Sequence, residues 1–252
     1  MSQEEEWLLK EKYSGVKSEA FHADLERLKA GEPLAYLIGH TPFLNCEIHL
    51  DSHPLIPRTE TEYWVVKAIE SIQKDLKPDT KILDLCAGSG CIGVAVAKAV
   101  SDSLITFAEI DPNHLSTIRK NLEHNLPDYS KQKEYLKVVE SNLFENIEGT
   151  FDFILTNPPY IDPVLDRTES SVKSHEPHLA LYGGSAGLDI INNIIKESPK
   201  YLNNDGELWI EHEPEQVGSM HSLALKYGFS VVTHKDQYGV ERFSVLTLRK
   251  IK

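Results

Sequence analysis

The sequence is short of basic residues. It holds 26 Lys and Arg against 39 Asp and Glu, a formal net charge of −13. A protein that grips the backbone of DNA or RNA needs a basic face to neutralise phosphates, so this deficit argues against broad phosphate-backbone binding. An acidic protein can instead meet a basic partner with electrostatic help. We therefore expect no stable nucleic-acid complex.

Cysteine and long apolar runs are scarce as well. Cys46, Cys86 and Cys91 form no Cys-x-x-Cys pair, so their spacing indicates neither a zinc site nor a disulfide framework and favours a reducing compartment. No apolar run approaches the ~18 residues that a membrane span needs. The acidic start, Met-Ser-Gln-Glu-Glu-Glu-Trp, is not typical of a signal or transit peptide. These features predict a cytoplasmic protein without membrane attachment or a metal, and leave a mitochondrial location open.

The apolar pattern changes along the chain. One or two short helices are predicted over residues 4–30, with Leu25 and Leu28 as core contacts, a half-buried strand over 46–51 and a helix over 64–76. Strands and helices then alternate, with strands predicted at 82–85, 104–110, 135–139, 151–156, 207–211, 230–234 and 243–248, and helices near 92–100, 115–122, 188–201 and 214–227. Such alternation predicts an α/β fold with a mainly parallel sheet covered on both faces.

A glycine loop follows the first strand of this alternating region. The run Asp84-Leu85-Cys86-Ala87-Gly88-Ser89-Gly90 lies between that strand and an apolar helix, where glycines let the backbone approach a ligand and the helix N-terminus offers free N–H groups. The loop lacks the Gly-Lys-Ser/Thr ending of a triphosphate loop and the third glycine of a dinucleotide fingerprint. Glu109 ends the next strand, where a carboxylate can hold both ribose hydroxyls. The pair indicates a nucleoside ligand without phosphates, such as S-adenosylmethionine.

A proline-locked corner, Asn157-Pro158-Pro159-Tyr160, follows the strand at 151–156. The Asn157 side chain and the Pro158 carbonyl can supply two acceptors for the two hydrogens of a planar NH2 group, and Tyr160 can stack on that group. The prolines hold these acceptors in place, which makes alignment for attack effective. The corner therefore predicts methyl transfer to a planar nitrogen, with Asn157, Pro158 and Tyr160 as catalytic residues and Pro159 beside them at the substrate.

The segments "LDLCAGSG", "AEIDP" and "NPPYI" resemble the class I S-adenosylmethionine-dependent methyltransferases that act on planar amino groups. Their flanks, "GEPLAYLIGHTPF", "LIPRTETE", "EPHLALYGGSAGLDII" and "IEHEPEQ", resemble the peptide chain release factor N5-glutamine methyltransferases. The resemblance runs from about residue 31 to residue 249. It implies a Rossmann-like domain with a seven-stranded, mainly parallel sheet, preceded by a short helical segment and a β-hairpin. The implied boundaries are 1–40 for the helical segment, 41–58 for the linker and hairpin, and 59–252 for the methyltransferase domain.

The resemblance also implies an activity and a set of site residues. The enzyme would methylate the glutamine of the Gly-Gly-Gln motif in a peptide chain release factor, its protein partner, and so modulate translation termination. S-adenosyl-L-methionine would be the cofactor, and the residues implied to bind it are Cys86, Ala87, Gly88, Ser89, Gly90, Glu109, Asn142, Leu143 and Asn157. Two positions depart from the family pattern, since Thr59 and Asn142 stand where Pro and Asp are usual.

Several alternatives stay open at this point. An adenine or cytosine amino-methyltransferase acting on nucleic acid uses a similar corner, and a non-catalytic cofactor-binding module is a third class. Arg58, Glu60 and Glu62 are as consistent with capping a helix as with lining a site. His175 is more consistent with a structural role than with a catalytic base. The segment 161–187 has little regular pattern, which favours a binding loop or lid.

Overall fold

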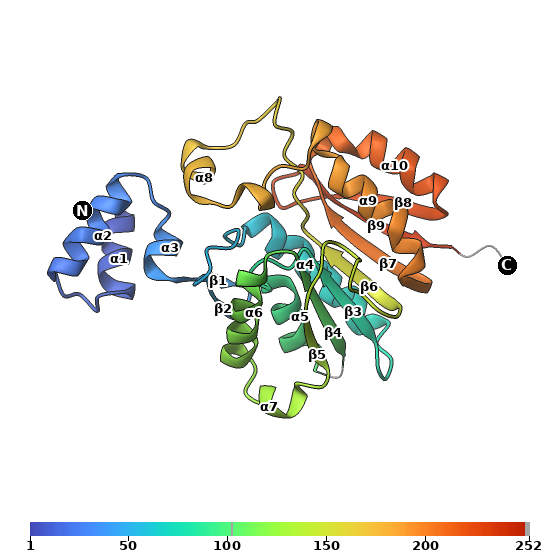
Figure 1. The fold of residues 1–252 in the computed structure, drawn as a ribbon, viewed down its shortest axis with the longest axis horizontal. Coiled ribbons are helices and arrows are strands. Elements are labelled where there is room, and N and C mark those ends of the chain that lie inside the picture. Colours follow the sequence, from blue (N-terminus) through green and yellow to red (C-terminus); the bar gives the residue numbers. More distant parts are fainter. Residues whose placement is uncertain (102, 250–252) are drawn as a thin grey trace.

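The computed structural model describes residues 1–101 and 103–249. In this part of the chain, seven strands form one sheet in the order β5-β4-β3-β6-β7-β9-β8 (Figure 1). The strands are β3 (Lys81–Leu85), β4 (Leu104–Glu109), β5 (Leu136–Glu140), β6 (Phe151–Thr156), β7 (Leu202–Glu211), β8 (Phe229–Lys235) and β9 (Glu241–Leu248). Neighbouring strands from β5 to β7 are parallel, whereas β9 pairs antiparallel with both β7 and β8. The predicted mainly parallel sheet is confirmed.

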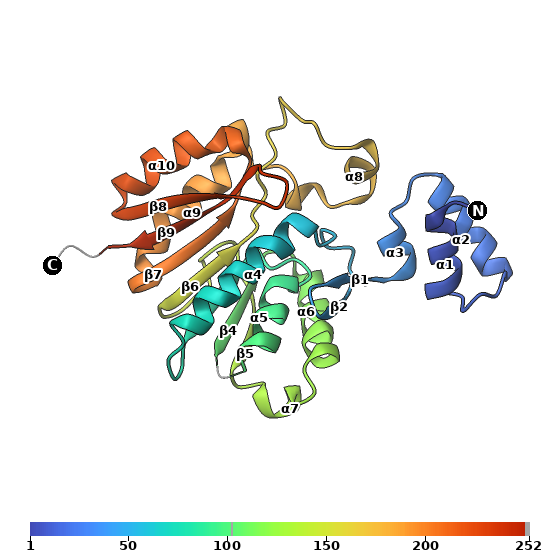
Figure 2. The ribbon, with the colours of Figure 1, turned by 180° about the vertical axis from the view of Figure 1, so that it is seen from behind.

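Helices cover both faces of the sheet. Successive strand residues point to opposite sides, so consecutive apolar residues need a helix layer on each face. Ile82 packs with the helices α4 (Thr59–Lys74), α5 (Cys91–Ala99) and α6 (Pro112–Asn125). Leu83 packs on the other side with α9 (Asp189–Glu197) and α10 (Val217–Lys226). Both residues are fully buried, which explains why both neighbouring positions in the middle of β3 are apolar. Figure 2 shows the α4–α5–α6 layer from behind.

Three helices and a hairpin precede the sheet. The helices α1 (Gln3–Glu11), α2 (Glu19–Lys29) and α3 (Leu34–Ile38) share a small core in which Leu25 and Leu28 are partly buried, as predicted. Strands β1 (His40–Phe43) and β2 (Cys46–His49) pair antiparallel, so the strand expected over 46–51 ends at His49. The helices lie at the opposite end of the molecule from α10 and β8 (Figure 1). The three-part division at residues 40 and 58 stays a prediction, and residues 250–252 lie outside the described ones.

The segment 161–187 is more regular than its sequence suggests. It contains α8 (Ser170–His175) and the short 3-10 helices η1 (His178–Ala180) and η2 (Ser185–Gly187). Gly187 has φ +67°, and a Cβ at this position would lie 1.9 Å from the Tyr160 carbonyl oxygen. Only glycine fits so close to another backbone. The segment is therefore packed tightly against the residues that follow β6.

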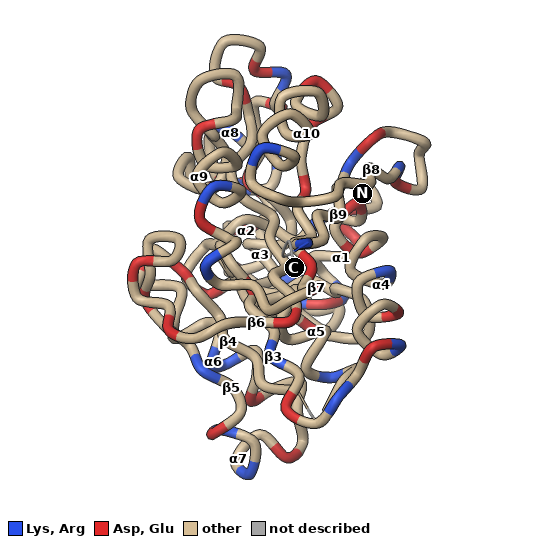
Figure 3. Tube along the Cα trace, turned by 90° about the vertical axis from the view of Figure 1, so that its right-hand side faces the viewer, with Lys and Arg blue, Asp and Glu red and all other residues tan. Residues whose placement is uncertain are grey.

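The remaining short elements are α7 (Tyr129–Gln132), η3 (Ser198–Lys200) and η4 (Pro214–Gln216). The helix predicted over 188–201 is α9 followed by η3, and β7 begins five residues before the strand predicted at 207. Acidic and basic residues are interspersed over the trace in Figure 3. Within the described residues, no helix is both long enough and apolar enough to cross a membrane.

Candidate active site

The predicted site residues meet at one edge of the sheet. Because β3, β4, β6 and β7 are parallel neighbours, their carboxyl ends lie side by side. The glycine loop follows β3, Glu109 ends β4, the Asn157 corner follows β6 and Glu211 ends β7. The structure thus brings the predicted loop, acid and corner together and adds a second acid from a distant part of the chain.

The glycine loop is held in left-handed backbone geometry. Cys86, Gly88 and Gly90 have φ values of +60°, +56° and +77°. A Cβ at Gly88 would have no atom within 4 Å, so the backbone there faces open space in which a ligand fits. Asp84 steadies the far side, since its Oδ2 accepts a 2.8 Å hydrogen bond from the Gly93 N–H in the first turn of α5.

Cys86 occupies a strained position, yet its thiol is not activated. Burial, reinforced by the negative charge of Glu109, raises the pKa of the Cys86 thiol to about 12. The thiol therefore stays protonated at neutral pH and lacks the thiolate character of a nucleophile. This agrees with a packing role for Cys86 in the turn.

Glu109 lies against the loop, as predicted. Its side chain is buried, and its two oxygens accept hydrogen bonds from the Gly88 N–H (2.7 Å) and the Asp111 N–H (2.9 Å). A carboxylate has about four acceptor positions, so each oxygen keeps capacity for one more donor. The two hydroxyls of a ribose could supply these two further donors, one to each carboxylate oxygen.

Asn142 and Leu143 follow β5, beside Glu109. The Ser141 N–H donates to the Glu109 carbonyl at 2.8 Å, which places the turn next to β4. Leu143 is half-buried with φ +51°, whereas Asn142 is exposed and donates through Nδ2 to Glu145 at 3.2 Å. The turn therefore lies on the Glu109 side of the site, where the adenine is expected.

The orientation of the Asn157 side-chain amide is fixed by hydrogen bonds to Thr61 and, through Thr61, to Glu211. Asn157 Nδ2 lies 3.2 Å from Thr61 Oγ1, and Thr61 Oγ1 lies 2.7 Å from Glu211 Oε2. Glu211 accepts, so the single Thr61 hydrogen points at it, and the Asn157 atom facing Thr61 must be the donor NH2. Asn157 Oδ1 consequently faces away from Thr61. We call the chain Asn157–Thr61–Glu211 the amide relay.

Glu211 also positions the other members of the corner. Its side chain is 1% exposed and accepts from Trp64 Nε1 at 2.7 Å and from the Tyr160 hydroxyl at 2.9 Å. Burial raises the pKa of Glu211, while the hydrogen bonds from Trp64, Thr61 and Tyr160 oppose the rise. Glu211 thus fixes the Asn157 amide and the Tyr160 ring from one buried point.

A cleft of roughly 630 Å³ opens between the corner and the segment 161–187. Its lining includes Arg58, Asn157, Pro158, Tyr160, Asp162, Glu169, Glu213 and Gln216. Gln216 Nε2 donates to the Tyr160 carbonyl at 2.7 Å and to the Gly187 carbonyl at 3.1 Å. The same amide therefore ties the corner to the segment that forms the other wall.

The residues left open by the sequence now have positions. Arg58 lines the cleft and pairs with the buried Glu176, so it is more than a helix cap. Glu62 accepts from the Leu44 N–H at 2.6 Å. His175 Nδ1 lies 2.9 Å from the Ser171 carbonyl in its own helix, which supports a structural role.

Sequence reasoning missed Thr61, Glu211 and Gln216. Thr61 lies within "LIPRTETE", and Glu211 and Gln216 lie within "IEHEPEQ". Both segments were recognised as whole motifs, yet no spacing rule connects residues 150 positions apart such as Thr61 and Glu211. An acidic residue directly after the apolar run Leu208-Trp209-Ile210 is the one local signal for Glu211.

The fold and the site together define a methyltransferase. The family model described as "Methyltransferase small domain" matches residues 68–173. Among solved structures, a methyltransferase from Pyrococcus furiosus has a TM-score of 0.58 at 17% identity, covering 91% of this chain and 99% of that one. The N-terminal domain of human METTL16, solved in complex with SAH, has a TM-score of 0.54 at 17% identity, covering 82% and 76%. Both share the fold.

Sequence relatives narrow the class. A release factor glutamine methyltransferase from Rhodopirellula baltica is 35% identical over 238 residues, 92% of this chain and 78% of that protein. One from Borreliella burgdorferi is 32% identical over 223 residues, 88% and 75%. A ribosomal protein uL3 glutamine methyltransferase from Francisella tularensis is 34% identical over 191 residues, 75% and 59%. The chain belongs to the release factor glutamine methyltransferase family.

Proposed function

We propose that this enzyme transfers the methyl group of S-adenosylmethionine to the side-chain amide nitrogen of the glutamine in the Gly-Gly-Gln motif of a peptide chain release factor, in the cytoplasm. The observation that carries the proposal is the amide relay. It keeps the Asn157 oxygen facing away from Thr61, where that oxygen and the Pro158 carbonyl would both face the acceptor amide. Two acceptors at one rigid corner match the two N–H bonds of a primary amide.

The residues of the cofactor side fit S-adenosylmethionine. Bound there, the cofactor supplies an electrophilic methyl group on a sulfonium centre. Glu109 keeps acceptor capacity for the ribose hydroxyls, and the open backbone at Gly88 leaves room for the methionine part. The loop residues from Cys86 to Gly90 would line that part, and Asn142 and Leu143 the adenine.

The residues of the acceptor side orient the glutamine. Asn157 Oδ1 and the Pro158 carbonyl would each accept one hydrogen of the substrate NH2, which aims the nitrogen's π electrons at the methyl group. Tyr160, held by Glu211, would pack against the amide plane. Because an amide nitrogen is a weak nucleophile, aligning it with the methyl group would be the main way to lower the barrier to transfer.

Glu211 does not act as the base. Its two oxygens already receive three donors from Thr61, Trp64 and Tyr160, so the carboxylate is committed to positioning. As the new N–C bond forms and the S–CH3 bond breaks, the amide nitrogen would become positively charged. This protonated amide is a strong acid and would release one proton to water without a dedicated base. Catalysis then depends on alignment rather than on proton abstraction.

The proposal is tested with labelled S-adenosylmethionine and three protein substrates. These are a release factor, the same factor with Gln→Ala in its Gly-Gly-Gln motif, and ribosomal protein uL3. We expect label on the unmodified release factor alone, located on the glutamine side chain by fragmentation mass spectrometry. Equal labelling of the Gln→Ala factor would contradict the proposal. Salt-sensitive labelling of DNA or RNA would favour the alternative, a nucleic-acid amino-methyltransferase.

A further inference from the structure

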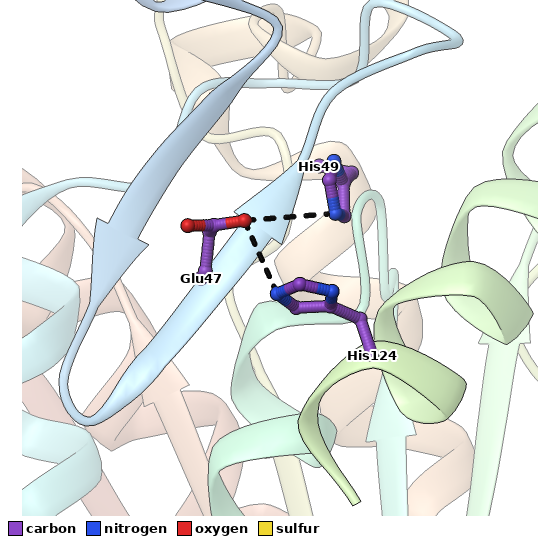
Figure 4. A group of neighbouring side chains, drawn as sticks. All are labelled: Glu47, His49 and His124. Carbon is purple, nitrogen blue, oxygen red and sulfur yellow. Dashed lines mark ion pairs between the residues drawn. The ribbon is translucent and has the colours of Figure 1, made fainter. Parts of the chain in front are cut away.

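Three side chains that can bind a metal meet outside the active site, where the hairpin touches the sheet domain. Glu47 and His49 lie on β2, and His124 lies on α6. Figure 4 shows one oxygen of the Glu47 carboxylate facing both imidazole rings. The cysteine spacing did not indicate a metal site. His124 is too far in sequence from Glu47 and His49 for the three residues to form a recognisable motif.

The distances between the donor atoms suit one small ion. Glu47 Oε1 lies 3.1 Å from His124 Nε2 and 3.8 Å from His49 Nε2, and the three ligand atoms are within 4.8 Å of one another. Donors bound at ~2.1 Å around a tetrahedral ion are about 3.4 Å apart. Small side-chain rotations are therefore enough to enclose an ion.

The backbone beneath the three side chains is rigid. Asn121 accepts from the His49 N–H at 2.7 Å and donates to the His49 carbonyl at 3.1 Å. Asn125 does the same for Glu47, at 3.0 Å and 2.8 Å. These four hydrogen bonds lock β2 to the last turn of α6, which carries His124. The donors are thus held together before any ion arrives.

The three side chains can be reached from solvent. The His49 side chain is 19% exposed, whereas those of Glu47 and His124 are 45% and 46% exposed. An ion can therefore enter from solvent, and His40, the direct β1 partner of His49, lies beside the entrance.

We propose that Glu47, His49 and His124 bind a divalent transition-metal ion. Two imidazole nitrogens and one carboxylate suit Zn²⁺ or Ni²⁺, whereas Mg²⁺ prefers oxygen donors alone. Water or His40 can complete the coordination. Because the ligands come from the hairpin and from α6, a bound ion links these two elements.

The test measures Ni²⁺ binding to the untagged full-length protein by isothermal titration calorimetry. Ni²⁺ is chosen because Zn²⁺ also binds thiolates, and this chain has three free cysteines. The variants are His49→Gln and His124→Gln, and the matched control is His22→Gln, an exposed histidine on α2. The hydrogen bonds to Asn121 and Asn125 use backbone atoms, so the variants keep the hairpin attached.

We expect one Ni²⁺ per chain, no comparable Mg²⁺ binding, and a melting temperature that rises with Ni²⁺. Each site variant should lose affinity roughly 10- to 100-fold, at least the loss seen when a supporting residue is removed from a metal site. His22→Gln should bind like the unmodified protein. Absence of Ni²⁺ binding by the unmodified protein would overturn the proposal, and so would His49→Gln and His124→Gln variants that bind Ni²⁺ as tightly as the unmodified protein does.

Discussion

The two halves of the active-site edge are built in different ways. The cofactor half is local: the loop from Cys86 to Gly90, Glu109 and Asp111 are close in sequence, and backbone N–H groups make most of the contacts. The acceptor half joins distant segments, since Asn157, Thr61 and Glu211 are connected through side chains. The proposed methyl transfer would thus use one site built mainly from backbone groups and one built from side chains.

The difference has a functional consequence. The cofactor half makes its contacts through backbone N–H groups, which a side-chain substitution leaves in place. A side-chain relay fixes which atom of Asn157 faces the substrate, and a single substitution can release it. We therefore expect changes in the cofactor half to weaken binding, and changes in the acceptor half to slow the transfer itself.

Asn157→Ala should have the largest effect. It removes the amide acceptor, so the methylation rate at saturating substrates should fall by about 100-fold or more, the scale of misaligned reactants. The rate is measured in single turnover with a release factor. Asn193→Ala, an exposed asparagine on α9, is the matched control and should keep the full rate. An Asn157→Ala rate near that of the control would remove the distinction between the halves.

Glu109→Gln should affect binding instead. Losing a hydrogen bond to a charged group costs ~1.5–3 kcal/mol, so the KM for S-adenosylmethionine should rise roughly 10- to 100-fold. The kcat at saturating cofactor should stay close to that of the unmodified enzyme. Initial rates over a cofactor series give both constants, with the exposed Glu134→Gln as the control. A lower kcat with unchanged KM would contradict a binding role.

Glu211→Gln should slow the transfer about tenfold, the lower end expected for modest misplacement of reacting groups. A neutral amide cannot accept from Thr61, Trp64 and Tyr160 together, because its NH2 end donates. The affinity for cofactor, measured by calorimetry, should change little. If affinity and rate fell in proportion, Glu211 would serve both halves.

A pH dependence of stability should come from His212, the buried residue that follows Glu211 and whose Nε2 lies 2.8 Å from Ser244 Oγ, without a change of rate at neutral pH. Burial lowers the pKa of His212 to about 4. Between this value and an unfolded pKa near ~6.5, the unfolded state binds more protons, so stability is full above pH ~6.5 and falls by up to about 3 kcal/mol toward pH 4. Denaturant unfolding across this range should show a flatter profile for His212→Gln. Identical profiles would exclude this source.

The sequence predicted the cofactor half better than the acceptor half, because the cofactor half is built from residues that are close in sequence and the acceptor half from residues that are far apart. The strand at 82–85, the loop and Glu109 follow local rules of apolar runs, glycines and strand ends. The corner was recognised from its prolines, but the partner of Asn157 depends on how α4 packs beside β7, which no local pattern specifies. The segment 161–187 lacks a regular sequence pattern, so its short helices were not predicted. They depend on packing against Tyr160, which local periodicity does not reveal.

The amide relay is tested most directly by comparing Thr61→Val with Thr61→Ser. Valine keeps the shape but removes the hydroxyl that accepts from Asn157 and donates to Glu211, whereas serine keeps it. In single-turnover methylation of a release factor at saturating cofactor, we predict a rate roughly tenfold lower for Thr61→Val and a nearly unchanged rate for Thr61→Ser. Equal rates for the two variants would show that the relay does not orient Asn157.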